Sequence, residues 1–180
     1  MAGLFSVSLI SEAQRLEEIT VIGVVPAGSS IDAAKLAYPI QTATADDLDN
    51  ASILNVADFL RQNFSSVSAN DAQNNPMQPD IQYRGFTASP LLGLAQGLAV
   101  YQNGVRINEP LGDTVNWDLL PQSAIQNLSL GGGTNPLYGL NSLGGALVID
   151  MKDGFNFEGA KLEISAGSFG RTVSNFEIGG

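Results

Sequence analysis

The side chains that carry out most protein chemistry are missing from this chain, because its 180 residues include no cysteine and no histidine. Their absence excludes disulfides, thiolate metal sites, Ser-His-Asp triads and Cys-His pairs, and it removes the commonest metal ligand. The eighteen carboxylates are scattered and lack the Asp-x-Asp-x-Asp-Gly spacing of a calcium-binding loop. We therefore predict no catalytic residue, no metal ligand and no cofactor, and a protein that is not an enzyme.

The charge balance limits the possible partners. Eight Lys and Arg residues stand against eighteen Asp and Glu residues, a net charge of -10, and phosphate neutralisation needs a basic stripe that this chain lacks. The glycines at 131–133 are not a phosphate cradle, because no Gly-Lys-Ser or Gly-Lys-Thr follows them. No apolar run reaches the roughly 18 residues that a membrane-spanning helix needs. We predict no nucleic-acid partner.

The order of apolar and turn-forming residues predicts one α+β domain, for which 180 residues with 44% apolar content suffice. Residues 38–43 are typical of a strand, and Thr44 with Asp47 three residues later predicts a capped helical turn. Ser52 is the predicted cap of a second helix, whose apolar residues recur at spacings of three and four. That apolar face consists of Ile53, Val56, Ala57 and Leu60.

The strongest local signal is Asn103-Gly104, because both central residues of a type I′ turn need a positive φ. It predicts a hairpin between strands at 98–102 and 105–108. Gly85-Phe86 is predicted to end a strand that begins at Asp80. Further strands are predicted at 126–130 and 146–151, and a short helix at 118–125.

Two polar loops offer candidate ligand contacts. Residues 69–79 are rich in turn formers, and residues 109–117 end in the only tryptophan. This tryptophan can offer a stacking face to a sugar or planar group, or it can pack in the protein core or against a surrounding wall. The candidate ligand-facing residues are Asn74, Gln78, Asn108 and Trp117.

After residue 154 the pattern changes to a regular alternation. Residues 161–166 and the run that ends at residue 180 alternate between apolar and polar side chains, with a turn at 167–170. Alternating segments of about ten residues joined by a short turn are typical of outer-membrane barrel strands.

Residues 135–154 read Asn-Pro-Leu-Tyr-Gly-Leu-Asn-Ser-Leu-Gly-Gly-Ala-Leu-Val-Ile-Asp-Met-Lys-Asp-Gly. Together with the Tyr-Arg-Gly-Phe segment at 83–86 and the hairpin at Asn103-Gly104, this segment resembles the plug domain of TonB-dependent outer-membrane receptors. The resemblance covers about residues 17–154. Asn103 stands where the family usually has aspartate. Three glycines at 131–133 stand where the family usually has arginine-glycine-proline, so a second arginine contact to the barrel is in doubt.

The resemblance implies an α+β fold with a small mixed four-stranded sheet, short helices and long loops, followed by the start of a transmembrane β-barrel. It divides the chain into four parts. Residues 1–16 are a flexible N-terminus or the remnant of a signal peptide, 17–30 the TonB box and linker, 31–154 the plug domain, and 155–180 the first strands of a truncated barrel.

The resemblance also implies partners. A TonB box adds as a strand to the C-terminal domain of TonB, although the same residues also suit an edge strand of the domain itself. The predicted box residues are Glu18, Ile19, Thr20, Val21, Ile22 and Gly23. Arg84 matches the family arginine that pairs with barrel carboxylates. The alternative is that Arg84 only caps a strand at the protein surface.

The implied function is gating of energised uptake across the outer membrane, with the plug inside the barrel lumen. The other partners are the protein's own barrel, the outer membrane around it, and a scarce small ligand on the extracellular side. Siderophores, vitamins and oligosaccharides are the candidate ligands. Two alternatives remain, which are a soluble periplasmic or cell-surface ligand-binding module and an assembly or export component with a plug-like gate.

Overall fold

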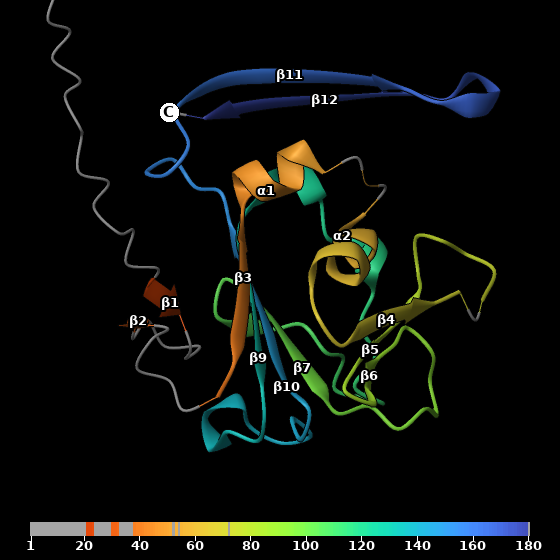
Figure 1. The fold of residues 1–180 in the computed structure, drawn as a ribbon, viewed down its shortest axis with the longest axis vertical. Helices are drawn as coiled ribbons and strands as arrows, with labels where there is room; N and C mark the ends of the chain where they lie inside the picture. The colour runs from red at the N-terminus through yellow and green to blue at the C-terminus, as the bar shows by residue number, and fades with distance from the viewer. Residues whose placement is uncertain are drawn as a thin grey trace, which may run out of the picture.

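A five-stranded mixed sheet forms the centre of the fold (Figure 1). Its strands, in spatial order, are β3 (Ile40–Thr44), β9 (Ile125–Gly132), β10 (Gly145–Met151), β7 (Leu98–Gln102) and β8 (Val105–Arg106). All neighbouring strands are antiparallel except β10 and β7, which are parallel. The computed structural model describes residues 21–23, 30–32, 38–51, 53, 55–71 and 73–179.

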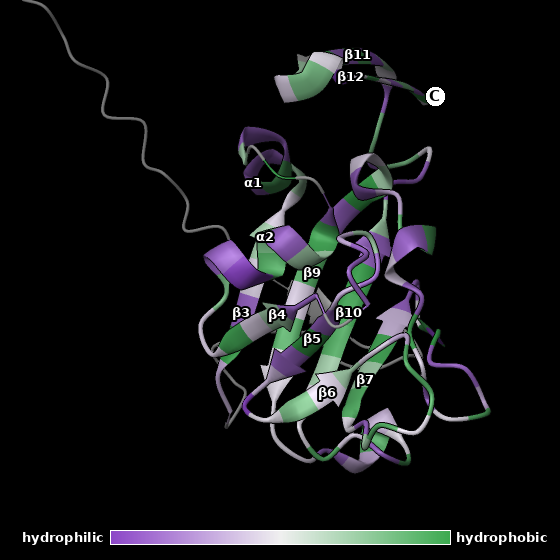
Figure 2. Ribbon diagram, turned by 90° about the vertical axis from the view of Figure 1, so that its right-hand side faces the viewer, coloured by the Kyte–Doolittle hydropathy of each residue, from purple (hydrophilic) through white to green (hydrophobic). Residues whose placement is uncertain are grey.

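A second, antiparallel sheet packs with two short helices against one face of the first. It consists of β4 (Val67–Asn70), β5 (Asp80–Tyr83) and β6 (Phe86–Ala88), and the helices are α1 (Ala45–Asn50) and α2 (Val56–Asn63). Figure 2 shows the apolar strands β9 and β10 behind this layer. The main core lies between the two layers, so the predicted α+β class and the mixed sheet are confirmed. Two-residue β8 adds a fifth strand to the four expected.

Side-chain caps fix the two helices. The predicted capping box at α1 is confirmed, because Thr44 accepts from the Asp47 amide and the Asp47 side chain accepts from the Thr44 amide. The prediction that Ser52 caps α2 was wrong, since Asn55 Oδ1 accepts from the Asp58 amide at 2.9 Å. Ser52 itself lies outside the described residues. The predicted apolar face is buried at Val56, Ala57 and Leu60.

Two-residue turns shape two hairpins. The predicted type I′ turn is confirmed, with φ of 47° at Asn103 and 78° at Gly104. A second turn of this kind lies at Arg84 and Gly85, with φ of 52° and 86°. Phe86 therefore begins β6 instead of ending the preceding strand, which corrects the predicted strand end.

Short 3-10 segments replace the predicted helix at 118–125. Pro121 separates η2 (Trp117–Leu119) from η3 (Gln122–Ala124), and the chain then continues into β9. A further 3-10 turn, η4 (Pro136–Tyr138), lies between β9 and β10. Within the described ranges, no helix is both long and apolar enough to cross a membrane.

Two separate hairpins complete the fold. β11 (Gly159–Ala166) and β12 (Thr172–Gly179) form an antiparallel pair joined through η5 (Ser168–Gly170), and this pair lies beyond α1 (Figure 1). β1 (Val21–Gly23) and β2 (Ser30–Asp32) form a small antiparallel pair near the start of the chain.

Candidate functional site

Loops from distant parts of the sequence meet at the end of the main sheet that lies opposite β11 and β12 (Figure 1). They comprise residues 89–97, 109–114 and 133–144, and we call this end the loop pole. The Gly144 amide donates to the Gly97 carbonyl oxygen at 2.8 Å, which joins the first and third loops. The second and third loops are joined by Asn141 Nδ2, which donates to Asp113 Oδ2 at 2.6 Å.

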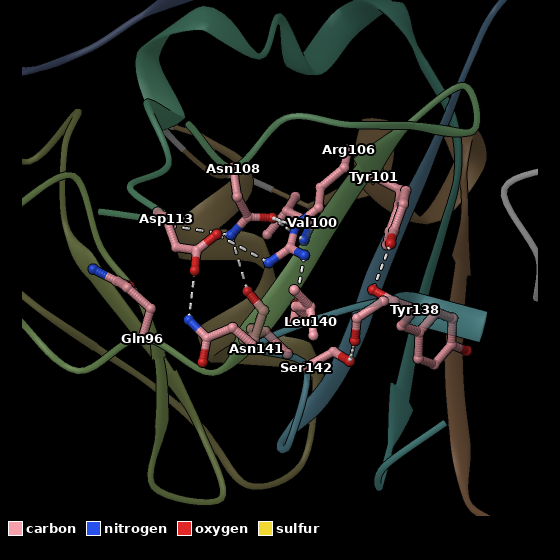
Figure 3. A network of polar contacts seen from close by, with 12 residues as sticks. Gln96, Val100, Tyr101, Arg106, Asn108, Asp113, Tyr138, Leu140, Asn141 and Ser142 are labelled. Atoms are coloured by element: carbon pink, nitrogen blue, oxygen red, sulfur yellow. Dashed lines mark hydrogen bonds and ion pairs between the residues drawn. The ribbon is translucent and has the colours of Figure 1, made fainter. Parts of the chain in front are cut away.

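The Arg106 guanidinium lies at the centre of these contacts (Figure 3). Its Nε donates to Asn108 Oδ1 at 3.2 Å, its Nη1 to the Leu140 carbonyl oxygen at 2.5 Å, and its Nη2 to Asp113 Oδ1 at 3.1 Å. One planar cation on β8 therefore holds two loops through a fixed fork of donors. The Arg106 and Asp113 side chains are 24% and 31% exposed, so the ion pair is partly shielded from water.

Both loops carry a strained residue next to this cation. Asp113 and Asn141 have positive φ values of 54° and 53°, a conformation that asparagine and aspartate tolerate better than other side chains. Each such residue still costs free energy and persists where its surroundings hold it. The contacts of Arg106 with Asp113 and of Asp113 with Asn141 provide that support.

Asn108 does not face a ligand, which corrects the sequence prediction. Its side chain is 8% exposed, and its Oδ1 accepts from the Val100 amide at 2.7 Å. Its Nδ2 donates to the carbonyl oxygens of Leu98 and Asp113, both at 3.2 Å. The amide thus continues the pairing of β7 beyond the last residue of β8, and all its donors and acceptors have protein partners.

Trp117 is also buried, which corrects its assignment as a ligand-facing residue. Its side chain is 3% exposed within the main core, and its Nε1 donates to the Ala88 carbonyl oxygen at 3.2 Å. The alternative reading, in which this tryptophan packs inside the domain, is the one that the structure shows. A satisfied, enclosed indole has no free face for stacking.

Asn74 and Gln78 lie away from the loop pole, at the other end of the β4–β5 hairpin. Their loop packs toward α2, where Asn55 Nδ2 donates to the Pro76 carbonyl oxygen at 2.7 Å. Gln78 Nε2 donates to Asp118 Oδ1 at 2.5 Å, while Asn74 is exposed. The four predicted ligand-facing residues therefore do not form one site.

Arg84 is an exposed residue at the tip of the β5–β6 hairpin. Its Cζ lies 5.1 Å from the centre of the Tyr83 ring, and it forms no ion pair with any residue that the structure describes. The Tyr83 hydroxyl is buried and has no hydrogen-bond partner among those residues. A Cβ on Gly132 would lie 2.7 Å from that hydroxyl and 2.9 Å from Arg84 Nη1. The glycine therefore makes room for both side chains.

Three tyrosines hold the 133–144 loop from the outer face of the sheet. Tyr101 Oη donates to the Tyr138 carbonyl oxygen at 2.7 Å, and the hydroxyls of Tyr38 and Tyr138 lie 3.4 Å apart. Burial raises the pKa of Tyr101 and of Tyr138, so both phenols are neutral across the physiological pH range. Neutral phenols keep the donors that this packing uses.

The predicted TonB box is described only in part. Glu18, Ile19 and Thr20 lie outside the described residues, whereas Val21–Gly23 pair with Ser30–Asp32. Strand β2 was not predicted, because its first residue belongs to a stretch rich in serine and glycine that is typical of a linker.

Sequence reasoning missed the Arg106 network. The signals were present, since Asp113 follows Gly112 and Asn141 stands in a glycine-rich stretch, where left-handed residues are common. Which cation they contact depends on loop folding that local patterns do not specify. Among the described residues, no group of three or more acidic side chains could hold a metal ion.

Comparisons with known proteins agree with this geometry. The family model described as the TonB-dependent Receptor Plug Domain matches residues 32–146. The chain is similar to the pyoverdine outer membrane receptor FpvA from Pseudomonas aeruginosa PAO1, with a TM-score of 0.61 and 16% identity over 82% of this chain and 20% of that chain. It is similar to the alcaligin outer membrane receptor FauA from Bordetella pertussis, with a TM-score of 0.61 and 13% identity over 86% of this chain and 26% of that chain.

The ferric yersiniabactin uptake receptor FyuA from Yersinia pestis gives a TM-score of 0.57 and 18% identity over 80% of this chain and 22% of that chain. These identities show a shared fold, and the chain spans about a fifth to a quarter of the length of the three receptors. No curated protein sequence matches the chain. Because the family model matches well over half of the chain and the fold agrees with it, this chain belongs to the family of TonB-dependent receptor plug domains.

Proposed function

We propose that this domain gates energised uptake of a scarce ligand through an outer-membrane receptor. In this proposal the domain blocks the lumen of a barrel, the ligand docks at the loop pole from the outside, and TonB pulls on the N-terminal segment. The observation that carries the proposal, beyond family membership, is the arrangement of side chains on β11 and β12.

The β11–β12 hairpin has its faces reversed relative to a soluble protein. Its apolar side chains point outward, with exposed fractions of 65% to 76%. They are Leu162, Ile164, Phe176 and Ile178. Polar side chains of the same strands face the plug, and Lys161 forms an ion pair with Asp49 of α1. An apolar outer face and a polar inner face are what a barrel strand in a bilayer requires. We therefore propose that residues 155–180 are the first barrel strands.

The same hairpin counts against a soluble binding module. Such a module would include the last 25 residues in its own sheet, whereas β11 and β12 pair only with each other. If the chain were a soluble protein, the hairpin would expose four large apolar side chains to water on one face. Soluble monomers avoid exposed apolar surfaces of this kind.

Arg84 is the proposed releasable contact to the barrel. It lies on the plug surface without an ionic partner among the described residues, and a guanidinium can bind a barrel carboxylate through two parallel hydrogen bonds. The family's usual second arginine is absent, because glycines occupy residues 131–133. A Cβ on Gly131 would lie 3.2 Å from Tyr38 Cε2 and 3.4 Å from the Tyr138 hydroxyl. Aromatic side chains fill the space beside this strand.

Deletion of the TonB box is the most direct test of the proposal. A box that binds TonB by strand addition uses its backbone donors and acceptors, and Val21–Gly23 already pair with β2, so TonB would have to pair along their other edge or replace β2. Deletion of residues 18–23 in the full receptor should abolish uptake and leave ligand binding intact. Deletion of residues 8–13 is the matched control, because it shortens the tail equally and keeps the box. Unchanged uptake after the first deletion would refute energised gating through this segment.

A further inference from the structure

The Tyr83 hydroxyl is a buried donor without an acceptor. Tyr83 is 1% exposed, and its Oη has no hydrogen-bond partner among the residues that the structure describes. The equally buried Tyr101 shows the usual situation, because its Oη donates to the Tyr138 carbonyl oxygen at 2.7 Å. Nearly all buried polar groups in folded proteins have a partner. The Tyr83 hydroxyl therefore indicates an acceptor that this part of the chain does not supply.

The Arg84 guanidinium converges with this hydroxyl above Gly132, the last residue of β9. The position that a Cβ on Gly132 would take lies 2.7 Å from Tyr83 Oη and 2.9 Å from Arg84 Nη1. Arg84 Cζ also lies 5.1 Å from the centre of the Tyr83 ring, a distance at which the ring face attracts a cation. The two donors are thus close enough to serve one acceptor group.

The backbone places Arg84 in a conformation that arginine rarely adopts. Its φ is 52°, in a turn position that asparagine or glycine would occupy at lower cost. The turn is fixed to the start of β4, because the Arg84 amide donates to the Ser66 carbonyl oxygen at 3.2 Å. Strained residues of this kind are concentrated at functional sites. The strain at this turn therefore points to a role for the arginine side chain.

Open space surrounds the two donors. A Cβ on Gly85 or on Gly133 would have no atom of the described residues within 4 Å. These glycines directly follow Arg84 and Gly132 in the chain. A group from outside the domain can therefore approach the guanidinium over two positions that carry no side chain.

A carboxylate is the acceptor that fits both donors. Its two coplanar oxygens match the fork of a guanidinium, and their remaining lone pairs can accept from a phenol. Arg84 takes part in none of the ion pairs of the described residues, so its charge is available. A phosphate dianion would be repelled more strongly than a carboxylate by a chain with a net charge of -10.

The hairpin proposed as the first barrel strands already makes contacts of this kind with the rest of the domain. Glu177 of β12 binds Lys152 at 2.7 Å, and the two side chains are 13% and 10% exposed. Lys161 of β11 binds Asp49 of α1. Because the described part of the wall meets the plug through carboxylate–cation pairs, a further wall carboxylate is the expected partner of Arg84.

From these observations we propose that Tyr83 and Arg84 form one carboxylate-binding site, in which the Tyr83 hydroxyl donates to the carboxylate that Arg84 binds. The inference rests on the proposed function, in which Arg84 contacts the barrel, and it adds Tyr83 as a second donor to that contact. A carboxylate of the barrel wall is the occupant, and Gly132 provides the space in which the two donors meet. A ligand carboxylate, an enclosed water molecule and non-specific anion binding are the competing outcomes.

The first test titrates the 180-residue chain with sodium acetate and follows the amide signals of Gly85 and Gly133 by NMR. We expect saturable shifts that sodium chloride at the same ionic strength does not produce. Tyr83→Phe should weaken acetate binding about tenfold, because a hydrogen bond to a charged acceptor is lost. Arg171→Ala is the matched control, since Arg171 is also exposed and takes part in none of the ion pairs of the described residues. Equal shifts with chloride, or unchanged acetate binding by Tyr83→Phe, would overturn the proposal.

Urea unfolding of the same chain separates a carboxylate partner from an enclosed water molecule. A hydroxyl that has no partner loses no hydrogen bond when it is removed, so Tyr83→Phe should leave the free energy of unfolding unchanged or raise it. Tyr101→Phe is the matched control, because it removes the hydrogen bond to the Tyr138 carbonyl oxygen and should lower that free energy. An equal loss in both variants would mean that water already satisfies the Tyr83 hydroxyl, which would contradict the inference.

The full receptor identifies the source of the carboxylate. With a barrel carboxylate on the hydroxyl, Tyr83→Phe should lower the Tm of the receptor without ligand, although it does not destabilise the 180-residue chain. An unchanged Tm would exclude the barrel as the source, and weaker ligand binding in the same variant would assign the carboxylate to the ligand. None of these measurements depends on TonB, so failure of this site and failure of energised gating in the box deletion remain distinguishable.

Discussion

Replacement of Arg106 by alanine tests whether one guanidinium organises the loop pole. The substitution removes the ion pair to Asp113 and the hydrogen bonds to the Leu140 carbonyl oxygen and to Asn108 Oδ1. A partly exposed ion pair contributes about 0.5–1 kcal/mol, and each of the two hydrogen bonds contributes roughly 1 kcal/mol. We expect the free energy of unfolding to fall by about 2–3 kcal/mol, less whatever strain the loops release.

Equilibrium urea unfolding measures that change, with the slope m unchanged because the buried surface of the core stays the same. Hydrogen exchange locates it, since protection should fall in residues 109–113 and 139–142 and persist in β9 and β10. Arg61→Ala is the matched control, because Arg61 is 50% exposed and pairs with Asp58 at 3.1 Å within one helix. Its expected cost is below about 0.5 kcal/mol. An Arg106→Ala change no larger than this control would refute the organising role.

Three further predictions concern packing, the ion pair between Lys152 and β12, and pH. Gly132→Ala should lower the free energy of unfolding, measured in urea, by about 1–3 kcal/mol, because Tyr83 is 1% exposed and its hydroxyl cannot move away from the added methyl group. Adding Tyr83→Phe to this variant should recover part of the loss. No recovery would contradict this contact. Lys152 and Glu177 pair at 2.7 Å with side chains 10% and 13% exposed, so a double-mutant cycle of Lys152→Met and Glu177→Gln should give a coupling of at least about 1 kcal/mol, measured by exchange protection of β12. Burial raises the pKa of Asp150, so its contribution to stability is fully present below the ordinary aspartate pKa of about 4 and is lost as the pH rises through the folded value. Asp150→Asn should therefore raise Tm at pH 7 and leave it nearly unchanged at pH 3, and an equal rise at both values would exclude titration as the cause.

Local chemistry made several elements predictable. The capping box at Thr44 and the type I′ turn at Asn103 depend on one or two residues and their backbone angles, so sequence alone identifies them. Alternation of apolar and polar residues predicted the β11–β12 hairpin, because successive side chains of a strand point to opposite faces. Strand β6 was missed because Arg84, a non-glycine residue, occupies a left-handed turn position. Nothing in the local pattern marks such a residue.

Exposure was the property that sequence predicted least well. Asn108 and Trp117 stand in polar stretches, which usually lie at the surface, yet both are buried. Asn108 is buried because its amide replaces backbone partners along β7, and Trp117 because its indole has a carbonyl acceptor inside the core. Whether a polar group finds such a partner depends on residues far away in the chain, and a local pattern does not contain that information.

The same dependence explains the three glycines at 131–133. In a solvated strand end, glycine only weakens the strand, because it has no side chain to pack. Here Gly131 lies beneath Tyr38 and Tyr138, while Gly132 lies beneath Tyr83 and Arg84, so larger side chains from other parts of the chain occupy the volume that side chains at 131 and 132 would need. An arginine at 131 would have to displace two tyrosines that also hold the 133–144 loop in place. The glycines therefore allow closer packing behind the loop pole, where an arginine at 131 could have contacted the barrel. Arg84 is then the arginine that projects from this end of the sheet.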